Sequence, residues 1–169
     1  MGKPILKKIV FITGATSGIG KASAKIFAKS GYQLIIAARR KDRLDELKKK
    51  LEKKYGVKVH ILSFDVRNRK DVKKKIEGLP EKWKKIDILL NNAGLAKGFD
   101  SIDKGDIDDW ETMINTNVLG LLYVTKAVSK MMIKHQSGHI INICSTAGHE
   151  VYPNGNVYCA SKHAVDALT

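Results

Sequence analysis

The sequence predicts an α/β fold, a doubly wound parallel sheet with helices on both faces in three layers, α/β/α. Two observations predict it. Short β-rich runs alternate with longer amphipathic stretches along the 169 residues, as in sheets whose parallel strands are joined by helices. The run from Ile86 to Leu90 is also nearly all apolar, which is typical of a strand buried on both faces. The length suits a single domain, residues 1–169.

Five strands and five helical regions are predicted from period and from the residues that break it. The strands cover residues 8–13, 33–38, 57–65, 86–90 and 139–144. The helices cover residues 19–29, 42–55 and 70–76, a long segment from 107 to 134, and a last helix from Asn156 onward. Because nothing closes this helix before Thr169, and only five strands are present, we expect the domain to lack its C-terminal strands.

Lysine dominates the charge. The chain has 31 Lys and Arg against 17 Asp and Glu, a net charge of +14. Within residues 43–55, leucines form one apolar stripe and Lys and Glu occupy the rest. No aromatic residue is interleaved for base stacking, so a solvated helix face is favoured over a nucleic-acid site, which stays open as an alternative.

The sequence also indicates where the protein resides. Its apolar runs are far shorter than the roughly 20 residues that span a bilayer, and residues 1–8 have no signal-peptide core. Cys144 and Cys159 form no CxxC pair. We therefore expect a cytoplasmic protein with no membrane partner. His135 and His139 are four residues apart, but a Ser-Gly pair breaks any helix between them, so no metal site is expected.

A glycine-rich turn, TGATSGIG at residues 13–20, joins the first strand to the first helix. Glycines let the backbone approach a pyrophosphate, while the free N–H groups and the positive end of the helix face the anion. The spacing, TGxxxGxG, is neither GxGxxG nor a P-loop. The residues predicted to bind a dinucleotide here are Gly14, Thr16, Ser17, Gly18, Ile19 and Gly20. An ordinary tight turn is the alternative.

Arg39 and Arg40 end the second strand, where NAD-binding folds usually carry a carboxylate for the ribose 2′-hydroxyl. Guanidinium groups can hold a 2′-phosphate instead, so NADP(H) is predicted in preference to NAD(H). The alternative is that both arginines only cap the sheet edge. Asp65, followed by Val66, is a candidate acceptor for the adenine amino group; alternatively, Asp65 caps the next helix.

Two further motifs complete the predicted site. Asn91-Asn92-Ala93-Gly94 follows the buried fourth strand, where open sheets bind ligands, and Asn91, Ala93 and Gly94 are taken as cofactor-binding; a simple turn is the alternative. Ser145 ends the fifth strand. Tyr158 and Lys162 are four residues apart, so they share one helix face, and the ammonium would lower the phenol pKa from its usual value of about 10. Cys144 and Cys159 are interpreted as packing residues.

Together these motifs resemble the short-chain dehydrogenase/reductase family over essentially the whole chain. The residues that carry the resemblance are TGATSGIG at 13–20, NNAG at 91–94, Asn117, Ser145 and YCASK at 158–162. Residues 91–96, 109–114, 138–143, 145–148 and 155–158 are similar to the NADP-dependent 3-hydroxy acid dehydrogenases of the serine and allo-threonine type.

The resemblance implies a Rossmann-type fold and an NADP(H)-dependent oxidoreductase that acts on a secondary alcohol or ketone, best a 3-hydroxy acid. It implies that Tyr158 takes the substrate's hydroxyl proton, that Lys162 lowers the Tyr158 pKa and binds the nicotinamide ribose, and that Ser145 orients the substrate oxygen. Asn117 would hold a water that links Lys162 to solvent; without the family it would be a structural helix residue.

The resemblance also implies a homotetramer or dimer, assembled through the helices that carry Asn117 and Tyr158. The missing C-terminal part would hold two strands and the substrate loop. Two alternatives to a working enzyme stay open: a protein that binds NADP(H) without catalysis, and an inactive fragment.

Overall fold

The computed structural model describes residues 8–169. The prediction that residues 1–8 contain no signal-peptide core concerns a segment of which residues 1–7 lie outside the described residues. Five parallel strands form one sheet in the order β3-β2-β1-β4-β5. The strands are β1 (Ile9–Thr13), β2 (Gln33–Ala38), β3 (Val59–Ser63), β4 (Ile88–Asn91) and β5 (His139–Asn142).

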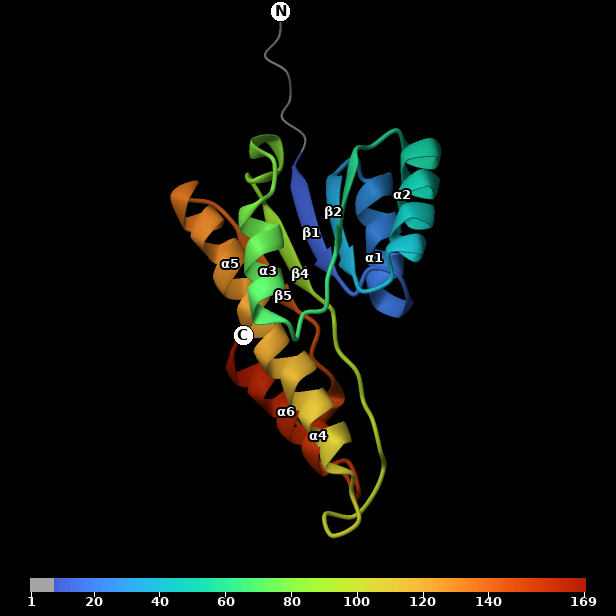
Figure 1. The fold of residues 1–169 in the computed structure, drawn as a ribbon, viewed down its shortest axis with the longest axis vertical. Coiled ribbons are helices and arrows are strands. Elements are labelled where there is room, and N and C mark those ends of the chain that lie inside the picture. Colours follow the sequence, from blue (N-terminus) through green and yellow to red (C-terminus); the bar gives the residue numbers. More distant parts are fainter. Residues whose placement is uncertain (1–7) are drawn as a thin grey trace, which may run out of the picture.

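Helices cover both faces of this sheet, as predicted (Figure 1). They are α1 (Gly18–Lys29), α2 (Lys41–Tyr55), α3 (Arg69–Glu77), α4 (Ile107–Ile114), α5 (Leu121–Lys134) and α6 (Asn156–Ala167). On one face, Ala24 of α1 and Leu47 of α2 pack in a core cluster with Ile36 of β2. On the other, Ile76 of α3 and Val128 of α5 belong to a second cluster. The three-layer α/β/α class is therefore confirmed.

The sheet places the site through its topology. From β1 the chain crosses to β2 and β3 on one side, then returns to β4 and β5 on the other. The crossovers diverge at the carboxyl ends of β1 and β4, which is where open α/β sheets bind ligands. Beyond these ends α4 and α6 lie side by side (Figure 1).

The long segment predicted over residues 107–134 is helical throughout, with a change of geometry in the middle. Between α4 and α5, Asn115–Gly120 forms a π-helix, a wider turn in which the hydrogen bonds span one more residue. Gly120 is required there, because a Cβ atom at this position would lie 2.7 Å from Cγ2 of Val66. The widened turn therefore brings this helix against the end of the β3 region.

Element ends differ from the sequence predictions by at most two residues. The third strand is shorter, Val59–Ser63 in place of 57–65, because at its N-terminal end Gly56 holds a left-handed conformation with φ 63°. The last helix ends at Ala167 and does not continue to Thr169, whose hydroxyl donates to the carbonyl of Val165. Among the helices of residues 8–169, none has both the length and the apolar character needed to cross a bilayer.

Candidate functional site

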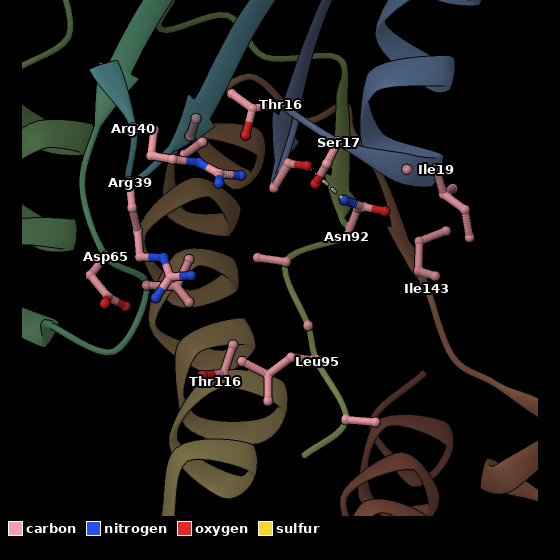
Figure 2. A pocket seen from close by; sticks show the side chains of 18 of the residues that line it. Thr16, Ser17, Ile19, Arg39, Arg40, Asp65, Asn92, Leu95, Thr116 and Ile143 are labelled. Atoms are coloured by element: carbon pink, nitrogen blue, oxygen red, sulfur yellow. Dashed lines mark hydrogen bonds between the residues drawn. The ribbon is translucent and has the colours of Figure 1, made fainter. Parts of the chain in front are cut away.

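A cavity of about 480 Å³ opens at the carboxyl edge of the sheet (Figure 2). The structure brings most of the predicted cofactor residues to its wall. Those residues are Gly14, Thr16, Ser17, Gly18, Ile19, Arg39, Arg40, Asp65, Val66, Ala93, Gly94, Tyr158 and Lys162. Four predicted residues do not line the cavity, namely Gly20, Asn91, Asn117 and Ser145.

The glycine turn passes close to the chain that follows β4. Gly14 has a φ of +63°, and a Cβ atom there would lie 2.8 Å from Nδ2 of Asn92 and 3.0 Å from Cα of Ala93. Gly20 meets the same neighbour, since its Cβ would lie 2.4 Å from Asn92 Nδ2. Gly20 thus allows the turn to pack against Asn92, on the side away from the cavity wall. Ser17, the residue before α1, makes no side-chain cap, so the first N–H groups of the helix remain available beside the cavity.

Thr13 and Asn92 lock the turn to the end of β4. Oγ1 of Thr13 accepts hydrogen bonds from the backbone N–H groups of Asn92 and Ala93, both at 3.0 Å. Nδ2 of Asn92 donates to the carbonyls of Thr13, at 2.9 Å, and Gly14, at 3.2 Å. Neither side chain had a role predicted from the sequence. The only signal was their place at two adjacent strand ends.

Replacing Thr13 with valine is expected to destabilise the protein, because two N–H groups would lose their acceptor at a position that is only 2% exposed. Each orphaned group costs about 1–3 kcal/mol. Urea unfolding would measure this loss against Thr13→Ser, which keeps the hydroxyl and should stay near wild type. Equal stability of the valine and serine variants would contradict the lock.

Arg39 and Arg40 extend from the end of β2 into the cavity (Figure 2). Both are exposed, and neither forms an ion pair with a carboxylate within residues 8–169. Asp65 stands on the same wall. It does not cap α3, because that cap is Asn68, whose Oδ1 accepts from the N–H of Asp71 at 3.1 Å. The helix-cap alternative for Asp65 is therefore wrong.

Asn91 points into the protein and away from the cavity wall. Its Nδ2 donates to Oγ1 of Thr125 at 2.8 Å and to Oδ1 of Asn142 at 2.9 Å. It is 4% exposed, and its Oδ1 meets no donor among the described residues. Asn91 accordingly ties β4 to α5 and β5, beneath the site.

Tyr158 and Lys162 lie one turn apart on α6 and both line the cavity. Lys162 is 7% exposed; its Nζ donates to the carbonyl of Ile143 at 2.9 Å and lies 5.9 Å from the centre of the Tyr158 ring. No carboxylate pairs with it among residues 8–169. Burial lowers the pKa of the Lys162 ammonium. The structure thus places a buried cation near the Tyr158 ring.

Ser145 begins a short 3₁₀ turn, Thr146–Gly148, in which its Oγ accepts from the N–H of Ala147 at 3.2 Å. The preceding residue, Cys144, does line the cavity, and its Sγ donates to the carbonyl of Lys162 at 3.3 Å. Cys159 is buried, as expected of a packing residue. Cys144 thus combines packing against α6 with a place on the cavity wall that the sequence did not reveal.

Asn117, in the π-helix, holds the loop after β4. Its Oδ1 accepts from the N–H of Leu95 at 2.9 Å, and its Nδ2 donates to the Leu95 carbonyl at 2.8 Å and to Oγ of Ser161 at 3.0 Å. Ser161 in turn donates to the carbonyl of Tyr158 at 2.7 Å. One buried amide therefore connects the cavity loop to the helix that carries Tyr158.

Other wall residues also escaped the sequence analysis. They are Ala37, Ala38, Phe64, Leu95, Ala96, Thr116 and Ile143, besides Asn92 and Cys144. Within residues 8–169, no three His, Cys, Asp or Glu side chains gather closely enough to hold a metal ion.

A family model of short chain dehydrogenases matches residues 8–169. The chain belongs to the short chain dehydrogenase family. Among relatives in this family, the NADP-dependent 3-hydroxy acid dehydrogenase of Escherichia coli is 48% identical over 154 residues, which cover 91% of this chain and 60% of that protein. The enzyme of the same name from Schizosaccharomyces pombe is 46% identical over 163 residues, 96% of this chain and 63% of that one.

Solved short chain dehydrogenases have the same fold. Serine dehydrogenase from Escherichia coli superposes with a TM-score of 0.89 at 46% identity, covering 95% of this chain and 72% of that one. The closed form of serine dehydrogenase complexed with NADP+ gives 0.90 at 46% identity, covering 95% and 63%. The chain spans about 60% of the length of the E. coli dehydrogenase that it matches in sequence.

Proposed function

We propose that this protein is an NADP(H)-dependent oxidoreductase, which moves a hydride between the nicotinamide and a secondary alcohol or ketone, best a 3-hydroxy acid such as serine. One observation carries the proposal. A single cavity holds the glycine turn and two arginines without an ion-pair partner in residues 8–169 at one part of its wall, and a tyrosine with a buried lysine at another. The relatives named as NADP-dependent 3-hydroxy acid dehydrogenases support the substrate class.

The wall suits NADP(H) in three respects. At Gly18, where φ is +48°, nothing lies within 4 Å of the place that a Cβ atom would take, so a pyrophosphate can approach the backbone there. The uncapped start of α1 offers N–H groups and a positive dipole end. Arg39 and Arg40 offer guanidinium groups for the 2′-phosphate, and Asp65 and Val66, which line the same cavity, would contact the adenine. When bound, the cofactor supplies the hydride acceptor or donor.

The side chains of α6 then transfer the proton of the substrate hydroxyl. Tyr158 removes the hydroxyl proton of an alcohol or returns one to a ketone. Lys162 holds its positive charge near the phenol, which lowers the cost of the phenolate. Ser145, which follows the wall residue Cys144, would orient the substrate oxygen. Asn117 would hold a water, and its hydrogen bonds also fix the cavity loop and α6 relative to each other.

We further propose that residues 1–169 form one domain of a cytoplasmic homo-oligomer. Large apolar side chains exposed on α4 and α5, those of Ile114, Leu122 and Ile133, support assembly through these helices. Light scattering of the purified chain would test the assembly, and a monomer would contradict it.

Fluorescence titration with NADPH and NADH tests the cofactor assignment. Wild type should bind NADPH more tightly, and Arg39→Gln/Arg40→Gln should weaken NADPH by about 10- to 100-fold, since a hydrogen bond to a charged group contributes about 1.5–3 kcal/mol. NADH affinity should change little. Arg43→Gln, an exposed arginine of α2 outside the cavity, is the matched control. An equal loss for both nucleotides would remove the assignment, and binding without turnover of any hydroxy acid would favour a non-catalytic role.

A further inference from the structure

Asp65 places a negative charge next to the arginines that are proposed to hold a 2′-phosphate. The ends of β2 and β3 are held together there, since the N–H of Phe64 donates to the carbonyl of Ala38 at 3.1 Å and Oγ of Ser63 donates to the carbonyl of Arg39 at 3.2 Å. Figure 2 shows the Arg39 side chain extending toward Asp65 on the cavity wall. An unpaired Asp65 would attract Arg39 and repel a phosphate.

The Arg67 side chain binds the Asp65 carboxylate. Its Nε lies 3.1 Å from Oδ1 and 3.0 Å from Oδ2 of Asp65, and its Nη2 lies 2.7 Å from Oδ2. The backbone N–H of Arg67 also donates to Oδ1, at 3.0 Å. Arg67 itself does not line the cavity. Both carboxylate oxygens are therefore engaged, in a planar bidentate geometry that arginine provides and lysine does not.

The charges agree with this geometry. Partial burial by itself raises the pKa of the Asp65 carboxyl, but the hydrogen bonds and charge of Arg67, with a smaller contribution from Arg39, outweigh it and lower the pKa. Asp65 is thus ionised at neutral pH. Arg67 is its ion-pair partner within residues 8–169, whereas Arg39 and Arg40 have none there.

We propose that Arg67 is a positioning residue that sets the preference for a 2′-phosphorylated dinucleotide. By engaging both oxygens of Asp65, it keeps that carboxylate from pairing with Arg39 and offsets the negative charge that the 2′-phosphate would meet. Asp65 remains able to accept a hydrogen bond from adenine, because each carboxylate oxygen has more than one acceptor direction. The inference rests on the proposed function and deepens it.

The test is Arg67→Met, with NADPH and NADH titrated separately by fluorescence. The ratio of the NADH and NADPH dissociation constants should fall by roughly five- to tenfold, as expected when a phosphate meets a competing charge in a partly exposed site. Most of the change should be in NADPH. Arg69→Met removes an exposed arginine two residues away that forms no ion pair within residues 8–169, and it should leave the ratio unchanged.

A second background separates positioning from a general structural effect. In Asp65→Asn protein no carboxylate competes for Arg39, so adding Arg67→Met should leave the ratio unchanged. An unchanged ratio in the single Arg67→Met variant, or a fall of equal size in the Asn background, would overturn the inference while leaving the proposed function intact. Wild-type protein that bound neither nucleotide would overturn the proposed function and this inference with it.

Discussion

Replacing Tyr158 with phenylalanine is expected to lower turnover of a 3-hydroxy acid by about 10²- to 10⁴-fold, the usual contribution of a positioned acid–base group. The variant keeps the ring, which lies on the cavity wall 5.9 Å from the Lys162 ammonium, and removes only the hydroxyl. NADPH affinity should therefore change little. A loss of turnover at constant cofactor binding would assign the phenol to the chemical step.

The measurement compares the rate of NADPH formation between the variant and wild type, together with a cofactor titration of the same samples. Tyr123→Phe is the matched control, because Tyr123 packs against the core from α5 and does not line the cavity. If Tyr158→Phe protein kept wild-type turnover, the acid–base role of Tyr158 would be rejected. If it also lost NADPH binding, the effect would have to be assigned to the architecture of α6.

The fold could be predicted because local patterns determine most of it. The continuous apolar run near Leu89 and the leucine stripe of α2 each indicate which face an element buries, and the parallel order follows from the alternation of strands and helices. The middle of the 107–134 segment could not be predicted in the same way. The π-helix at Asn115–Gly120 contains Asn117, which bonds the backbone of Leu95 across 22 residues, a contact that no local pattern contains.

The candidate site likewise contains residues that could be predicted from the sequence and residues that could not. Motif residues such as Gly14 and Arg39 reach the cavity because strand ends converge there, which the sequence order already implies. Asn91 belongs to the same motif as Ala93 but is the last residue of β4 and turns inward to Thr125 and Asn142, whereas Ala93 lies in the loop that follows the strand. Which side chain of a motif faces the cavity depends on the register of the sheet, and no local pattern contains that register.

The ion pair between Asp65 and Arg67 gives a further example. The sequence offered two roles for Asp65, adenine acceptor and helix cap, and the structure assigns the cap to Asn68. The bidentate ion pair of Arg67 with Asp65 depends on a turn after β3 that brings the two side chains together. Spacing alone does not distinguish that turn from a first helical turn.

Replacing Lys162 with methionine is expected to abolish most turnover and yet to stabilise the fold at neutral pH. Lys162 is only 7% exposed, and its ammonium has one hydrogen bond, to the Ile143 carbonyl, with no carboxylate partner in residues 8–169. Burying a charge on these terms disfavours the folded state. Methionine is an unbranched side chain one atom shorter than lysine and carries no charge, so the free energy of unfolding should rise by about 1 kcal/mol.

The pH dependence of the stability difference between Lys162→Met and wild type distinguishes removal of a buried charge from better packing. Burial lowers the folded-state pKa of Lys162 below its ordinary value of 10.5, so between the two values the unfolded chain binds the proton that the folded chain has lost. Wild-type stability should therefore gain from this group as pH rises through that window, and the advantage of Lys162→Met should shrink toward pH 10.5. Urea unfolding at several pH values, with the exposed Lys126→Met as control, would measure both. A methionine variant whose advantage did not depend on pH would owe it to packing, and one less stable than wild type would show that the Ile143 hydrogen bond outweighs the cost of the buried charge.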